Sequence, residues 1–136
     1  MSNVPVPGAA AMAGAHDGHV MIDLGDDAFT RGRPHPMFEP GVRDAPLAEA
    51  LADPNVGVVL LDVVLGYGGH LDPAGHLAAF LGGHDRRAVI LASVTGTDAD
   101  PQPRETQVRK LVDADVIVAE SNADAAETAI AAIGPA

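Results

Sequence analysis

The sequence predicts an α/β fold in which helices cover both faces of a doubly wound parallel sheet. Short runs rich in Val, Ile and Leu are apolar on both faces, as strands buried in a parallel sheet are. Between these runs lie segments that start with capping residues or Pro and stop at Gly or Pro. The resulting order, βαβαβαβα, predicts a flavodoxin-like sheet of four to five strands.

Four apolar runs are predicted to be strands. They are HVMIDL at 19–24, VGVVLLDVVL at 56–65, AVILASV at 88–94 and DVIVAES at 115–121. Asp23 lies near the end of the first run, and Asp62 interrupts the second. A carboxylate near a pocket can act as a base, but more often it caps loop amides or pairs with an arginine. Asp23 is kept as a catalytic candidate, whereas Asp62 lies too deep in its strand for that role.

The intervening segments are predicted to be helices at 46–54, 72–83, 104–114 and 122–134. Asp72 is a candidate N-cap that precedes Pro73, and Pro favours the first helical turn. Asn122 is the expected cap of the last helix, and Gly134 its stop.

Composition limits the domain organisation and the function. The 136 residues suit one domain, with 1–18 as a flexible tail or linker remnant and 19–136 as the folded part. A net charge of −11, with three Phe, one Tyr and no Trp, argues against nucleic acid and anionic membranes as partners. The absence of cysteine fits a cytoplasmic protein. His16 and His19 have metal-ligand spacing without a third ligand, so no metal site is predicted.

The glycine-rich stretch GYGGHLDP at 66–73 is the first candidate site. In an open parallel sheet, ligands bind beyond the carboxyl ends of the strands, where this stretch falls. Gly66, Gly68 and Gly69 allow backbone amides to turn inward, and the following helix N-terminus attracts anions. Together they predict an anion seat, at which His70 would donate a hydrogen bond or accept a phosphoryl group. The alternative is a flexible turn with an exposed histidine.

The stretch TRGRPHP at 30–36 is the second candidate. Arg31, Arg33 and His35 lie within five residues and can grip a carboxylate or phosphate. Alternatively, the arginines brace their own loop by pairing with nearby carboxylates. The two candidate stretches are expected to face each other across one pocket. Thr95 and Asn122, in the loops TGTDADPQP and SNADAA, complete the candidate anion-binding residues, and His70, Asp23 and His35 are the candidate catalytic ones.

Four stretches together resemble the final domain of FdrA-type acyl-CoA synthetase-like proteins. They are IDLGDDAFTRGRPHPM, LADPNVGVVLLDVVLGYGGHLDPAG, ASVTGTDADPQ and ESNADAA, and the resemblance runs from about His19 to the end. At greater distance the chain is similar to the carboxy-terminal CoA-ligase domain of the succinyl-CoA synthetase β subunit. His70 does not match the phosphohistidine motif of succinyl-CoA synthetases, and Phe38 and Glu39, at the end of the GRPHPM loop, stand where an Ile-Asp pair is usual.

The resemblance implies a flavodoxin-like domain of a larger complex that handles an acyl or carbamoyl phosphate. Relatives make or cleave an acid–phosphate–CoA linkage, or transfer carbamoyl groups with oxalurate or oxamate as substrate. Partners would be CoA-binding and ATP-grasp or carbamoyltransferase domains, together with a small carboxylate or phosphate ligand. No tightly bound cofactor is expected, although CoA, ATP or phosphate would enter the full complex. The alternative is a non-catalytic assembly or regulatory module of such a complex.

Overall fold

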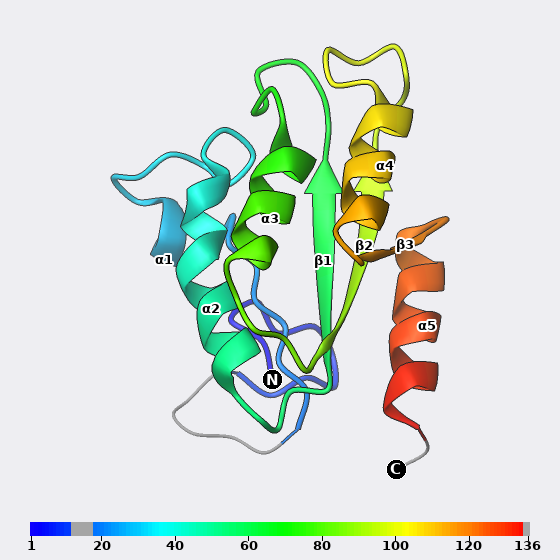
Figure 1. The fold of residues 1–136 in the computed structure, drawn as a ribbon. Coiled ribbons are helices and arrows are strands. Elements are labelled where there is room, and N and C mark those ends of the chain that lie inside the picture. The colour runs from blue at the N-terminus through cyan, green and yellow to red at the C-terminus, as the bar shows by residue number, and fades with distance from the viewer. Residues whose placement is uncertain (12–17, 135–136) are drawn as a thin grey trace.

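A parallel sheet of three strands forms the centre of the computed structural model, which describes residues 1–11 and 18–134 (Figure 1). The strands are β1 (Val58–Val64), β2 (Val89–Thr95) and β3 (Ile117–Ala119), in the spatial order β1-β2-β3. All neighbours are parallel, and the register sets Asp62 of β1 beside Ser93 of β2. The predicted fold class is confirmed, with three strands instead of four to five.

The helices predicted from the sequence form close to their expected positions. They are α2 (Asp44–Ala52), α3 (Pro73–Gly82), α4 (Arg104–Asp113) and α5 (Asn122–Ile133). Two short elements, α1 (Asp27–Thr30) and the 3-10 helix η1 (Pro40–Arg43), divide the long connection that precedes α2. The cap of α5 differs from the prediction, because the side chain of Ser121, and not Asn122, accepts the N–H of Asp124.

The prediction of a strand at 19–24 is wrong. This segment contacts the N-terminal residues instead, through an isolated bridge between Ser2 and Met21 and a hydrogen bond of 2.8 Å from the Met21 N–H to the Met1 carbonyl. The Asn3 side chain bonds both the N–H and the carbonyl of Asp23, each at 2.8 Å. The segment thus uses its backbone groups outside the sheet. His16 lies outside the described residues.

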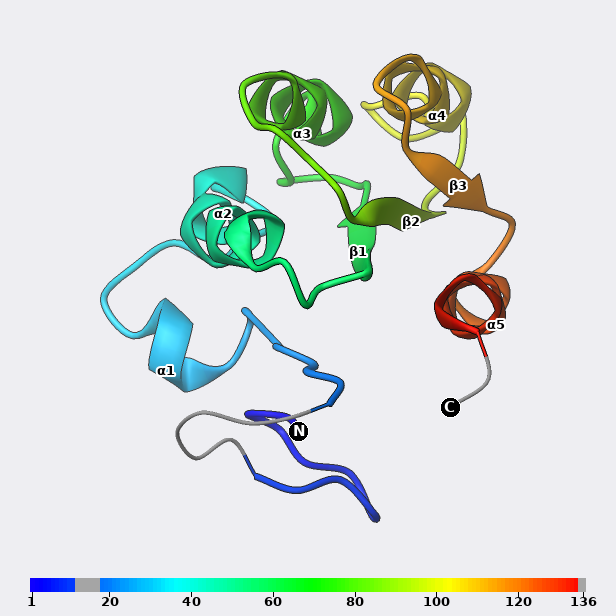
Figure 2. The same ribbon diagram turned by 60° about the horizontal axis from the view of Figure 1, so that its bottom comes forward.

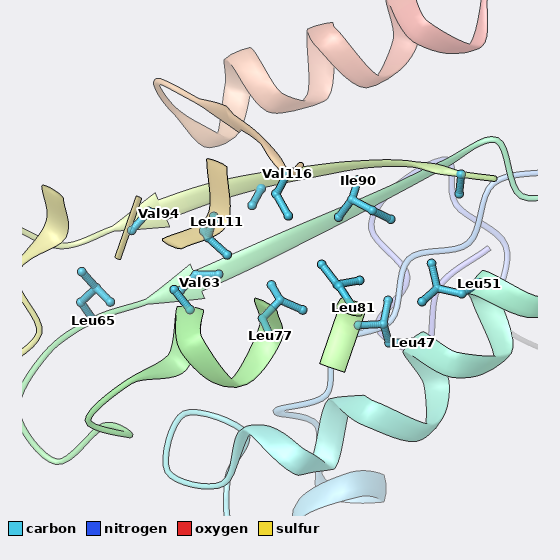
Figure 3. Close-up of a cluster of buried hydrophobic side chains, with 13 residues drawn as sticks. Leu47, Leu51, Val63, Leu65, Leu77, Leu81, Ile90, Val94, Leu111 and Val116 are labelled. Carbon is cyan, nitrogen blue, oxygen red and sulfur yellow. The ribbon is translucent and has the colours of Figure 1, made fainter. Parts of the chain in front are cut away.

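Helices cover the two faces of the sheet unequally (Figure 2). α3 and α4 pack together on one face, and α5 packs on the other face against all three strands. The main core fills the first side, where α2 also contributes leucines (Figure 3). Its large members are Leu47, Leu51, Val63, Leu65, Leu77, Leu81, Ile90, Val94, Leu111 and Val116.

Beneath α5 lies a smaller set of buried residues, Leu91, Ala119 and Ala125. Alternation along β2 explains the division, since Ile90 and Ala92 belong to the main core while Leu91 points to the opposite face. None of the helices in the described part of the chain has the length and apolar character that a membrane crossing requires.

Candidate functional site

A buried glutamine joins the loops that follow β1 and β2. Gln102 is 1% exposed, and its Oε1 accepts the Gly66 N–H at 3.0 Å. Its Nε2 donates to the Gly66 carbonyl at 3.2 Å and to the His70 carbonyl at 2.8 Å. One side chain therefore satisfies both ends of the glycine-rich turn, and the two loops form a single unit at the carboxyl end of the sheet.

Contact with the glycine-rich turn comes from Met37 and Phe38, which follow the stretch 30–36, and no hydrogen bond among the described residues joins 30–36 itself to 66–73. The His70 N–H donates to the Met37 carbonyl at 2.8 Å. The Met37 side chain approaches Gly69, and the Phe38 ring approaches Gly68. Gly68 has φ of +78°, a conformation that favours glycine.

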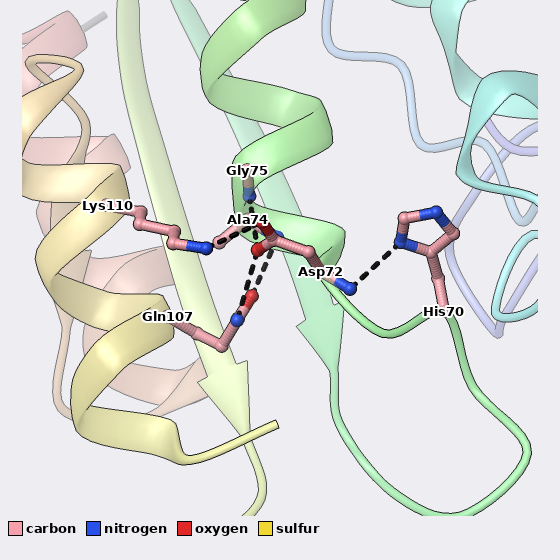
Figure 4. Close-up of polar contacts among 6 residues, drawn as sticks. All are labelled: His70, Asp72, Ala74, Gly75, Gln107 and Lys110. Carbon is pink, nitrogen blue, oxygen red and sulfur yellow. Dashed lines mark hydrogen bonds and ion pairs between the residues drawn. The ribbon is translucent and has the colours of Figure 1, made fainter. Parts of the chain in front are cut away.

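Most amides of the predicted anion seat already have acceptors within the chain (Figure 4). The Gln107 Oε1 accepts the Ala74 N–H at 2.9 Å, and the Asp72 carboxylate accepts the Gly75 N–H at 3.0 Å. Within the described residues, the N–H groups of Tyr67, Gly68 and Leu71 have no acceptor. The amides left for a ligand are therefore two at the tip of the turn and one, that of Leu71, just before α3.

Asp72 is the centre of this polar network. Besides the Gly75 N–H, its carboxylate accepts hydrogen bonds from Gln107 at 3.1 Å and from Lys110 at 2.6 Å. Burial is the largest single influence and acts to raise the pKa of Asp72, but the bonds from Lys110, Gly75 and Gln107 together with the Lys110 charge outweigh it. The pKa of Asp72 is therefore held below its ordinary value, so the group is a stable anion that fixes the start of α3.

The ring of His70 is oriented by the same loop. Its Nδ1 accepts the Asp72 N–H at 3.1 Å, so in the neutral ring Nε2 carries the proton. The His76 ring lies 6.2 Å from it, centroid to centroid. His76 itself pairs with Asp44 at 2.9 Å.

Asp23 and His35 lie together on either side of Gly25. The Asp23 carboxylate accepts the Gly25 N–H at 2.8 Å, and the His35 Nδ1 accepts the Met37 N–H at 3.1 Å. A β-carbon at Gly25 would come within 2.9 Å of the His35 Nε2 and 3.1 Å of the Asp23 Oδ1. No hydrogen bond among the described residues links this pair to His70.

The remaining candidate anion-binding residues each make separate contacts. Arg31 makes an exposed ion pair with Asp27 at 3.5 Å, as the alternative of a self-braced loop predicts. The Arg33 side chain is exposed, and its N–H donates to the Thr30 carbonyl. Thr95 ends β2, where its carbonyl accepts the Leu65 N–H at 2.8 Å.

Asn122 takes part in a separate cluster on the α5 side of the sheet. Its side-chain amide donates to the Asp62 carboxylate at 2.8 Å, and the Ser93 hydroxyl donates to the same oxygen. Asp62 was expected to be structural, and these bonds give it a partner on β2 and on α5.

The sequence did not point to three residues that have structural roles, namely Gln102, Gln107 and Arg43. Gln107 precedes the buried Leu111 by four residues, a spacing that places a residue on the inner side of α4. Arg43 donates from Nη1 to the Asp62 carbonyl at 3.4 Å, while its buried Nε has no partner. Burial lowers the pKa of Arg43 despite the nearby Asp44 charge.

No group of three or more metal-ligating side chains occurs within 1–11 and 18–134.

Comparison with known proteins identifies the family. The CoA-ligase family model matches residues 9–132. The chain is also 43% identical over 111 residues to "Uncharacterized protein YahF" of Escherichia coli (strain K12). That match covers 76% of this chain and 22% of the relative, so the chain spans about a fifth of the relative's length. The chain belongs to the CoA-ligase family.

Proposed function

We propose that this chain is one domain or subunit of an FdrA-like acyl-CoA synthetase or carbamoyltransferase, in which its carboxyl-edge loops hold an acyl or carbamoyl phosphate. Membership of the CoA-ligase family supports this assignment. The observation that carries it is the buried Gln102, which fixes the glycine-rich turn at the carboxyl edge of the sheet, where open parallel sheets generally bind ligands. The isolated chain is expected to be inactive.

The larger complex would supply the remaining chemistry. The match covers only 22% of the relative's length, and this supports the presence of partner domains outside the matched part. We propose that these are CoA-binding and ATP-grasp or carbamoyltransferase domains, and that CoA, ATP or phosphate enters with them.

In this proposal the phosphoryl group binds at the tip of the turn. The N–H groups of Tyr67 and Gly68 would donate to its oxygens, and the Nε2–H of His70 would donate to them as well. Gly66 and Gly69 shape the turn and do not bind the anion directly, because the Gly66 amide is held by Gln102 and the Gly69 amide by the Gly66 carbonyl.

The other candidates would act around that point. The exposed Arg33 would grip the substrate carboxylate, and Arg31 would join it by releasing Asp27. Asp23 and His35, which share Gly25 as a neighbour, would form a proton-transfer pair. Thr95 and Asn122 would line the far side of the same edge.

A non-catalytic assembly module is the second candidate function. It is favoured by the internal acceptors that occupy the α3 amides and by two exposed apolar side chains at the loop, Tyr67 at 86% and Leu71 at 78%. Such side chains at a rigid loop suit contact with a partner.

Titration with inorganic phosphate, followed by amide NMR, tests the anion-binding role. Shifts confined to 66–71 and 30–36 are expected despite the net charge of −11, because the acidic surface is screened beyond about 8 Å at physiological salt. Gly68→Val should abolish binding because φ is positive there, and Arg33→Ala should weaken it. Gly134→Val, also at positive φ but at the end of α5, is the matched control. Scattered shifts, or none at millimolar phosphate, would contradict the proposal.

Activity separates the two candidate functions. If Gly68→Val and Arg33→Ala leave an assembled complex fully active, the assembly module is the better description. Efficient ATP-dependent CoA ligation by the isolated chain would contradict both.

A further inference from the structure

β1 has the composition of an interior strand but lies at an edge. Its sequence, VVLLDVV, is apolar on both faces apart from Asp62, which is typical of a strand that has neighbours on both sides. In the described part of the chain β1 pairs with β2 alone. Edge strands of natural proteins are usually blunted by charges, Pro or bulges, and β1 carries only the one Asp.

The register identifies the backbone groups that face outward. The Leu65 N–H bonds the Thr95 carbonyl, and the Val89 N–H bonds the Gly57 carbonyl. Odd-numbered residues of β1 therefore point their N–H and carbonyl groups toward β2, and even-numbered ones point theirs away. The outward set is Val58, Leu60, Asp62 and Val64. Among the described residues these groups have no backbone partner, and only the Asp62 carbonyl has a side-chain donor.

An apolar strip runs beside this open edge. Leu60 is 40% exposed and Val64 is 46% exposed, both on the face that α5 covers elsewhere. α5 buries Leu91 of the neighbouring strand completely. The uncovered part of that face is therefore the part nearest the free edge.

Arg43 places hydrogen-bond donors at the same edge. Its Nη1 reaches the Asp62 carbonyl, and its buried Nε has no partner in the described chain. A buried guanidinium donor without an acceptor costs free energy. An extended backbone that displaced Arg43 from the Asp62 carbonyl would bring carbonyl oxygens to this donor.

We propose that an extended, mainly apolar segment of a partner chain adds to the open edge of β1 as a fourth strand. The partner is the part of the assembly that corresponds to the portion of the YahF chain outside the match, since this chain matches only 22% of that relative. The inference rests on the proposed function in one respect, which is that the partner belongs to the same complex. It requires no anion binding.

Two other occupants fit the structure less well. A second copy would bring together two chains that each carry a net charge of −11, which opposes association. The chain's own segment 19–23 already bonds residues 1–3 through Met21 and Asp23.

The test uses the E. coli YahF chain from which the matched segment has been deleted. It is added to the isotope-labelled 136-residue chain, and amide hydrogen exchange is measured by NMR together with the stoichiometry of any complex. We expect a one-to-one complex in which the amides of Leu60, Asp62 and Val64 become at least tenfold more protected. The odd-numbered amides of β1 should be protected in both states, because β2 already holds them.

Leu60→Lys and Val64→Lys should abolish the complex, while Ile130→Lys, at an exposed position of α5, should leave it intact. Protection of the odd-numbered amides in each variant shows that the sheet has folded. Lack of binding, or binding without protection of the even-numbered amides, would overturn the proposal. Protection that grows with the concentration of the chain alone would assign the edge to a second copy, and protection at every concentration would assign it to segment 19–23. Either result would also overturn it. Failure here leaves the phosphate titration unaffected.

Discussion

At the scale of single residues, two buried glutamines hold the candidate site together. Each uses its carbonyl oxygen to accept one loop or helix N–H and its amide nitrogen to donate to a neighbouring oxygen. A buried amide side chain is tolerated when both ends are bonded, and it then specifies one geometry. Their partners are 36 and 33 residues away in sequence, so no local pattern encodes these contacts.

Replacing Gln107 with Leu should destabilise the protein. The change leaves the buried Ala74 N–H without its acceptor and removes a donor from Asp72, which costs about 1–3 kcal/mol. Urea denaturation followed by circular dichroism measures the loss. Thr106→Leu, at an exposed position of the same helix, is the control and should change the free energy of unfolding by no more than about 0.5 kcal/mol. Equal stabilities of the two variants would show that the Gln107 bonds do not contribute.

Asp72 should make the stability depend on pH. Its pKa is lower in the folded than in the unfolded chain, so its stabilisation is complete above the unfolded pKa of 3.8 and is lost as pH falls through the folded value. Asp72→Asn keeps a capping side chain but removes the charge. We expect the wild type to be more stable by under about 1 kcal/mol at neutral pH, because the Asp72–Lys110 pair is partly exposed.

The stability difference between wild type and Asp72→Asn should shrink as the pH falls toward about 3, measured by urea denaturation along the pH series. Asp113→Asn, an exposed site on α4, controls for the general loss of one negative charge. A difference that stays constant with pH would contradict the assignment.

At the scale of elements, the sequence predicted most helices and strands because their signals are local. Asp72 and Pro73 start α3, and the apolar runs around Val63 and Leu91 form β1 and β2. The run at 19–24 carries the same apolar signal but lies outside the sheet. An apolar composition indicates that a segment can form a strand. It does not determine which part of the backbone will pair with that segment. Here Met1 and Asn3 provide those bonds.

The N-terminus of α5 offers a direct comparison between the expected and the observed cap. Ser121→Ala removes the acceptor of the Asp124 N–H and should cost about 1 kcal/mol of the free energy of unfolding. Asn122→Ala removes only an exposed bond to Asp62 and should cost less. Urea denaturation of the two variants decides between them. A larger loss for Asn122→Ala would mean that Asn122 is the cap, as the sequence suggested.

At the scale of the whole molecule, the sequence predicted where the candidate site lies, but not which of its amides remain without an acceptor. The carboxyl ends of parallel strands converge, so the loops after β1 and β2 had to lie together, and they do. The Asp72 carboxylate, which accepts the Gly75 N–H, was expected from the sequence as the cap of α3. The acceptor of the Ala74 N–H comes from α4, a helix whose sequence carries no signal for that contact beyond the inward spacing of Gln107. Chain topology therefore fixed the neighbourhood of the site, and tertiary packing decided which amides stay open to a ligand.

The excess of acidic residues should make the whole fold more stable as salt is added. The chain has 19 acidic and 8 basic residues, so its folded form brings like charges closer together than its unfolded form does. The ion pairs that salt would weaken are mostly exposed, among them Arg31–Asp27 and Arg109–Glu105, and such pairs contribute little. Screening of the general repulsion should therefore dominate. Urea denaturation at neutral pH, in low and then moderate sodium chloride, should show the midpoint rising. Potassium chloride should give the same rise if screening is the cause, and a midpoint that falls with either salt would mean that the ion pairs outweigh the repulsion.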